Sequence, residues 1–110
     1  MAYDAELAER IRDGLVGTSG ISEKKMFGGI AFLLNGNLCV GVWKDSLTVR
    51  LSAEEGDAAV YEPHVRDFDI TGTPMRGWVI VEPAGIEEDR DLAEWIHRAK
   101  EFVATLPAKC

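Results

Sequence analysis

Residues 25–43 read KMFGGIAFLLNGNLCVGVW and decide the fold. Asn35-Gly36, in the middle, is the strongest short-range signal for a two-residue β-hairpin, because both residues tolerate a positive φ. The apolar runs around it predict strands at 25–34 and 37–43. A two-residue connection joins only antiparallel neighbours, so this stretch is expected to form a long apolar hairpin.

Apolar side chains are expected on both faces of this hairpin. Within 25–34 one face would carry Met26, Gly28, Ile30, Phe32 and Leu34, and the other Lys25, Phe27, Gly29, Ala31 and Leu33. Within 37–43 the same alternation opposes Leu38, Val40 and Val42 to Cys39, Gly41 and Trp43. A strand with one solvated face should instead alternate apolar with polar residues. We therefore expect one face to pack on helices and the other to contact a second copy of the chain or another protein; a loop or crossing helix over it is the alternative.

Three helices are predicted around the strands. The first begins at the N-cap Asp4 and ends at Gly17. The second is short, spans 53–61 and is capped by Ser52. The third carries apolar residues at the 3.6-residue period from Leu92 to Leu106.

Further strands complete the predicted order. Lys44-Asp45 indicates a tight turn into a strand at 46–51, and strands are expected at 65–70 and 76–82. The order α-β-β-β-α-β-β-α predicts an α+β fold, with an antiparallel sheet of about five strands and helices on one sheet face. No repeat, low-complexity tract or linker interrupts the chain, so one domain over 1–110 is expected.

The composition limits the classes of partner. The chain has 12 basic and 19 acidic residues, a net charge of −7, and 46% hydrophobic residues, which is enough for a packed core. A negative chain repels polyanions on average, so direct nucleic-acid binding and binding to an anionic membrane are both disfavoured. The first residues carry no apolar signal segment, and the two cysteines, Cys39 and Cys110, suit no disulfide framework; both points indicate a cytoplasmic protein.

Three clusters combine residue types that bind metals or act as nucleophiles: His64 with Asp67 and Asp69, Glu94 with His97 and Glu101, and Cys39 with either histidine. The first two supply too few ligands to define a metal site. A thiol in the middle of a strand is usually buried and inert. We therefore expect no catalytic residue, no metal and no cofactor. The alternative, a small-molecule-binding or enzymatic site, would need His64, Asp67 or Cys39 to converge with a basic residue.

Basic residues suggest two further interpretations. Lys24-Lys25 before Gly28-Gly29 could form an anion-binding loop, but neither phosphate-binding glycine motif is present, so a bulge or a close backbone approach is the better explanation of glycines within a strand. A weak nucleic-acid-binding accessory role, the other alternative, would need Lys24, Lys25, Arg50 and Arg76 on one surface.

Several motifs occur in a fixed order: Glu23-Lys24-Lys25-Met26-Phe27-Gly28-Gly29 with Phe32 and Asn35-Gly36-Asn37, then Leu47-Thr48-Val49-Arg50, then Gly72-Thr73-Pro74-Met75-Arg76-Gly77-Trp78, and a closing helix with Trp95. This set, over about residues 3–107, resembles the N-terminal domain of the TfoX/Sxy competence-regulator family, in its short, free-standing form. The resemblance implies a fold like that of type III secretion chaperones, among which dimers are common, and a link to transcription or competence regulation.

We therefore predict a non-enzymatic protein-interaction or regulatory module that forms a homodimer or binds a protein partner. Its contact surface would be the second sheet face, where aromatic and apolar side chains anchor the partner and basic ones orient it. The residues predicted to make this contact are Lys25, Phe27, Leu33, Trp43, Arg50, Arg76 and Trp78.

Overall fold

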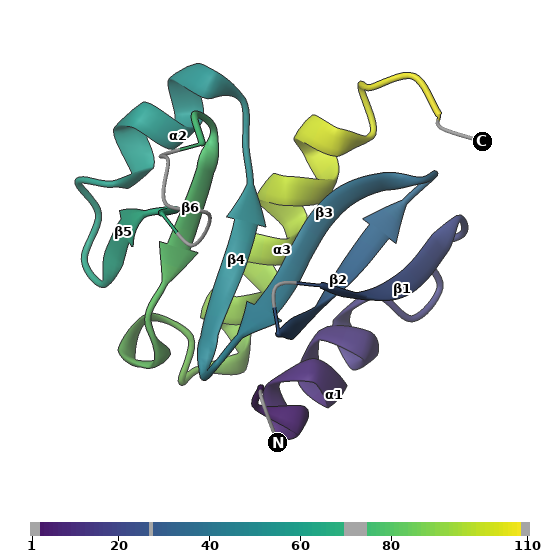
Figure 1. The fold of residues 1–110 in the computed structure, drawn as a ribbon, viewed down its shortest axis with the longest axis horizontal. Coiled ribbons are helices and arrows are strands. Elements are labelled where there is room, and N and C mark those ends of the chain that lie inside the picture. Colours follow the sequence, from purple (N-terminus) through teal and green to yellow (C-terminus); the bar gives the residue numbers. More distant parts are fainter. Residues whose placement is uncertain (1–2, 27, 70–74, 109–110) are drawn as a thin grey trace.

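A computed structural model describes residues 3–26, 28–69 and 75–108. Its elements, in chain order (Figure 1), are α1 (Ala5–Gly14), β1 (Ile21–Met26), β2 (Gly29–Leu34), β3 (Asn37–Trp43), β4 (Ser46–Arg50), α2 (Ala53–Ala59), β5 (Val65–Asp67), β6 (Trp78–Val81), the 3-10 turn η1 (Pro83–Gly85) and α3 (Asp89–Val103). The strands form one antiparallel sheet in the order β1-β2-β3-β4-β6-β5. The predicted α+β class is confirmed.

The prediction of a single strand over 25–34 is wrong. The chain reverses within this stretch, because β1 and β2 pair antiparallel with Met26 opposite Gly29. Gly28 takes a φ of +76°, which glycine adopts without the penalty of a Cβ. The sheet therefore has six strands rather than five. Lys25 lies opposite Ile30, so it shares a face with Ile30 and not, as predicted, with Ala31.

The two predicted tight turns are confirmed. Asn35 and Gly36 take φ values of 53° and 82°, as a type I′ turn requires, and join β2 to β3. Lys44 takes a φ of 56° between β3 and β4. Two short connections thus hold three strands in register, and this register positions the candidate site.

One face of the sheet packs on α1 and α3. The Asp4 carboxylate starts α1 by accepting the backbone N–H groups of Glu6 and Leu7, at 2.9 and 3.1 Å. Apolar residues of both helices form one core with the strand residues Ile30, Phe32, Val40, Val42, Leu47, Val49, Val79 and Val81. Figure 1 shows α3 running behind β3 and β4. No helix in the described part of the chain is long and apolar enough to cross a bilayer.

A β-bulge interrupts the alternation in β3. Phe32 pairs with Val40, but Leu33 pairs with Leu38, so two residues of β3 oppose one residue of β2. Cys39 joins the core with 1% of its surface exposed, and Leu38 joins the face of Leu33. The predicted grouping of Leu38 with Val40 is therefore wrong, because the extra residue reverses the side-chain direction at that point.

The short helix α2 packs near the start of β6 (Figure 1). The Ser52 hydroxyl caps it by accepting the N–H of Glu55 at 3.1 Å. Gly56 of α2 rests on the chain just before β6, because a Cβ on Gly56 would lie 2.6 Å from the Cα of Gly77. The helices α1 and α3 pack against the middle of the sheet, and Ala59 of α2 joins the same core at its end. We call the sheet face opposite α1 and α3 the open face.

Candidate interaction site

Small residues line up across the open face. Ala31 of β2 lies opposite Gly41 of β3, and Gly41 lies opposite Thr48 of β4. Directly opposed residues share a face, and neighbouring strands lie about 4.8 Å apart. Three adjacent strands thus present a methyl group, a hydrogen and a threonine side chain in one row, which forms the floor of a trough.

Gly41 makes this floor low because no larger residue fits there. A Cβ on Gly41 would lie 2.7 Å from the carbonyl oxygen of Ile30 and 2.9 Å from the Oγ1 of Thr48. Both distances are below ordinary van der Waals contact, so the strands around Gly41 are packed closely. A glycine inside a strand often marks such an approach.

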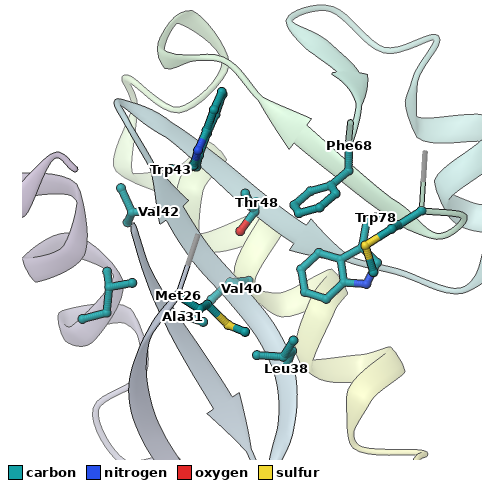
Figure 2. A pocket seen from close by; sticks show the side chains of 11 residues that line it. Met26, Ala31, Leu38, Val40, Val42, Trp43, Thr48, Phe68 and Trp78 are labelled. Carbon is teal, nitrogen blue, oxygen red and sulfur yellow. The ribbon is translucent and has the colours of Figure 1, made fainter. Parts of the chain in front are cut away.

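Larger side chains stand around the floor and enclose a cavity. Figure 2 shows Trp43 and Trp78 on opposite sides of Thr48, with Phe68 next to Trp78. The rings of Phe68 and Trp78 lie 5.2 Å apart, centroid to centroid, at 47°. The cavity has a volume of about 70 Å3, and Met26, Leu38 and Met75 complete its largely apolar wall.

The open face is partly covered by the chain that follows β5. Phe68 is buried, and its carbonyl accepts the N–H of Met75 at 3.2 Å, which places these two residues side by side at the cavity. Trp43 and Trp78 stay half-buried, and Met75 is 38% exposed. The outcome lies between the two alternatives drawn from the sequence, because Phe68 and Met75 cover one side of the face and both tryptophans keep part of their surface exposed.

Basic side chains lie near the rings of both tryptophans. The Nζ of Lys44 lies 4.6 Å from the ring centroid of Trp43, and the Cζ of Arg50 lies 6.0 Å from that of Trp78. Within the described residues, neither cation has a carboxylate within 4.0 Å. The rim therefore carries local positive charge, although the whole chain is negative.

A third cation at this rim is already neutralised. The Cζ of Arg66 lies 6.0 Å from the Trp43 ring centroid. Arg66 also contacts the carboxylates of Asp69, at 3.4 Å, and Glu82, at 3.8 Å. Its charge is therefore compensated within the chain.

The structure places four of the seven predicted contact residues on or beside the open face: Leu33, Trp43, Arg50 and Trp78. Lys25 lies on the helix-covered side, for the register reason given above. Arg76 is bound to Asp57 of α2 at 2.9 Å. Phe27 lies outside the described residues.

The other candidate metal-binding and nucleophilic residues form no site within the described part of the chain. Burial raises the pKa of the Cys39 thiol to about 11, so this thiol stays protonated near neutral pH. Asp69 is bound to Arg66, and His97 is bound to Glu101 at 3.0 Å. Between residues 3 and 108, leaving out 27 and 70–74, no group of three His, Cys, Asp or Glu side chains could hold a metal ion.

The predicted basic group is dispersed. Lys24 lies opposite Ala31 and shares its face, whereas Lys25 lies on the other face, and Arg76 is paired with Asp57. The two glycines after Lys24-Lys25 act through backbone geometry: Gly28 allows a positive φ, and a Cβ on Gly29 would lie 2.0 Å from the carbonyl oxygen of Val42. These positions give no continuous phosphate-binding surface.

Sequence reasoning missed Thr48, Phe68 and Met75 as parts of the site. The alternation in β4 could have placed Thr48 opposite Gly41, since the turn at Lys44 fixes that register. Phe68 is apolar within the charged stretch Arg66-Asp67-Phe68-Asp69, a signal of burial against a neighbour. Nothing local indicates that Met75 returns to the same cavity.

Comparison with known proteins returns a family and no individual relative. No curated protein and no solved structure matches the chain. A likeness to secretion chaperones therefore stays a prediction. The family model described as the TfoX N-terminal domain matches residues 13–103, which span every strand, all of α2 and α3, and the end of α1. This protein belongs to the TfoX N-terminal domain family.

Proposed function

We propose that the protein is a non-enzymatic interaction module that binds a protein partner through its open face. The observation that carries this proposal is the apolar cavity between two half-buried tryptophans. Aromatic side chains around a central pocket are the usual anchors of protein interfaces. The apolar groups there are surrounded by polar and charged residues, which is the common anatomy of a contact surface.

We also propose that this contact serves a regulatory system in the cytoplasm, linked to transcription or competence. Membership of the TfoX N-terminal domain family supports the regulatory part. A module of this kind acts by binding, so it needs no catalytic residue, and the inert thiol of Cys39 is consistent with that. The partner could be another protein or a second copy of the chain, and an experiment can separate the two.

The test compares the wild-type chain with Trp43→Glu and Met75→Glu. The matched control is Tyr61→Glu, because Tyr61 is 89% exposed and lies outside the cavity. Each protein serves as bait in quantitative affinity capture from extracts of its own source, and its mass in solution is measured by sedimentation. Circular dichroism and thermal unfolding verify that every variant is folded.

We expect the wild type and Tyr61→Glu to share one partner, or one oligomeric state, that both cavity variants lose. A buried charge in place of an anchor costs binding free energy, typically about 2 kcal/mol or more at the centre of an interface. The same captured proteins and the same mass for all four chains would reject the proposal. A wild type that is monomeric and captures nothing specific would also reject it.

A further inference from the structure

We infer that the occupant of the open face is an acidic peptide segment with one bulky apolar residue, which enters the cavity. This inference rests on the proposed function and names the chemistry of the partner. Three observations carry it: the size of the cavity, the cations without a carboxylate partner near its two tryptophans, and the positions of those cations at the two ends of β4.

The size of the cavity suits one side chain. Clefts that bind cofactors or drug-sized ligands have volumes of about 300–1,000 Å3. The cavity here has about 70 Å3, which accommodates the end of a leucine, methionine or phenylalanine side chain rather than a whole ligand. Met75 at the rim is flexible and partly exposed, so the wall can adapt to anchors of different shape.

The free cations favour carboxylates next to the anchor. Arg50 is half-buried, and the one hydrogen bond that it donates among the described groups is long, 3.4 Å to the carbonyl oxygen of Leu38. A guanidinium presents five donors and binds a carboxylate through two of them. Lys44 supplies a second cation, on the Trp43 side of the cavity.

The positions of the two cations at the ends of β4 predict the spacing of acidic residues in the peptide. Lys44 lies in the turn before β4 and Arg50 ends the strand, so the two cations flank β4, which itself rises about 13 Å from Ser46 to Arg50. An extended peptide places residues i, i+2 and i+4 on one side and spans the same length. The expected pattern is therefore an acidic residue at i, a bulky apolar residue at i+2 and an acidic residue at i+4.

The same charges disfavour a second copy of the chain. A twofold contact brings identical patches together, so Lys44 and Arg50 of one protomer would face a patch that carries the same positive charges. Like charges across an interface weaken it.

The two cations also disfavour a small aliphatic acid as the occupant. An aliphatic acid with one carboxylate would pair with one cation and leave the other unpaired, so a segment with carboxylates on both sides of the anchor fits better.

The experiment selects ligands from a displayed library of random twelve-residue peptides, with the full chain as bait. We expect enrichment of the acidic–x–apolar–x–acidic pattern. An enriched peptide is then synthesised with a fluorophore, together with a version in which Asp and Glu become Asn and Gln. Its affinity is measured by anisotropy for the wild type, Met75→Glu, the double variant Lys44→Gln/Arg50→Gln, and the control Tyr61→Glu.

We expect the double variant and the amide peptide each to bind about tenfold more weakly, as two partly exposed ion pairs predict. Met75→Glu should weaken binding by at least as much, and Tyr61→Glu should change nothing. Raising the salt concentration from 50 to 500 mM should weaken the binding of the acidic peptide and leave that of the amide peptide unchanged. Thermal unfolding identifies any variant that has lost its fold, and the amide peptide tests the charge with the protein unaltered.

Four results would overturn the inference: no enriched peptide, enriched peptides without acidic residues, competition by hexanoate at the affinity of the peptide, or a wild type that sediments as a dimer through this face. If neutral peptides bind and Met75→Glu abolishes their binding, the open face remains an interaction surface and only the acidic chemistry fails. If every open-face variant binds as the wild type does, the proposed function fails as well.

Discussion

Gly28 and Gly29 are adjacent, yet the fold needs them for different reasons. Gly28 takes a positive φ, and a Cβ there would meet no described atom within 4 Å, whereas a Cβ on Gly29 would lie 2.0 Å from the carbonyl oxygen of Val42. We expect Gly28→Ala to lower the free energy of unfolding by about 1 kcal/mol. Gly29→Ala should lower it by about 3 kcal/mol, because backbone atoms must move. Urea denaturation measures both, and equal losses would contradict this account.

Cys39 should be unreactive in the folded protein. Its pKa is raised to about 11, mainly by burial, so the thiolate is scarce at pH 8. A Cys110→Ser chain isolates this thiol. We expect its reaction with Ellman's reagent at pH 8 to be slow in buffer and fast in 6 M guanidinium chloride. A native rate close to the unfolded rate would show that Cys39 is accessible.

Individual residues with local roles were predictable from the sequence. Asp4 and Ser52 cap their helices because a short polar side chain satisfies free N–H groups, and this chemistry depends only on the next few residues. The turn at Asn35-Gly36 was predictable for a similar reason, because it depends on the positive φ of these two residues alone. The directions of the Leu38 and Cys39 side chains were not predictable, because the β-bulge reverses them and the apolar pattern of the sequence does not indicate a bulge.

At the scale of elements, an ion pair joins α1 to β1 and should make their contact depend on pH. Arg12 binds both carboxylate oxygens of Glu23, at 2.7 and 2.8 Å, which lowers the pKa of Glu23 and raises that of Arg12. A lowered carboxyl pKa stabilises the fold above the ordinary pKa of 4.5, and the contribution disappears as pH falls through the folded value.

We therefore expect the wild type to be more stable than Glu23→Gln by about 0.5 kcal/mol at pH 7, a small value because both side chains are about one-third exposed. As the pH falls below 4.5 towards 3, the difference should shrink, because the contribution of the pair is lost as the pH falls through the lowered pKa of Glu23. Urea denaturation at both pH values measures it, with 0.5 M salt as a second way to weaken the pair. A difference that stays constant from pH 7 to pH 3 would contradict the assignment.

The elements differed in how well the sequence predicted them. α3 was clear because its apolar residues follow one period over fifteen residues. β1 was missed because it is an edge strand with the polar stretch Ser22-Glu23-Lys24-Lys25 at its centre, and such strands lack the apolar alternation that signals a sheet. The insertion of β6 between β4 and β5 depends on contacts distant in sequence, so no local pattern predicts it.

At the scale of the whole molecule, about half of the site was visible in the sequence. An apolar pattern on both faces of the central hairpin predicted a second apolar face that a partner or a loop would cover, and Trp43 and, from the strand predicted at 76–82, Trp78 were assigned to it. The cavity itself depends on the strand register and on the chain after β5, which bring Thr48, Phe68 and Met75 together. The positive charge of the rim could not be inferred from the net charge of −7. It depends on which basic side chains pair with acidic ones in the folded chain.

The three tryptophans offer the most direct test of the claim that the open face is a docking surface. Trp43 and Trp78 border the cavity, whereas Trp95 is buried in the core on the helix side. In a 1H–15N spectrum the three indole N–H signals report separately. On addition of the selected acidic peptide, the signals of Trp43 and Trp78 should shift in a saturable way while that of Trp95 stays in place. Equal shifts at all three, or a shift at Trp95 alone, would contradict the account.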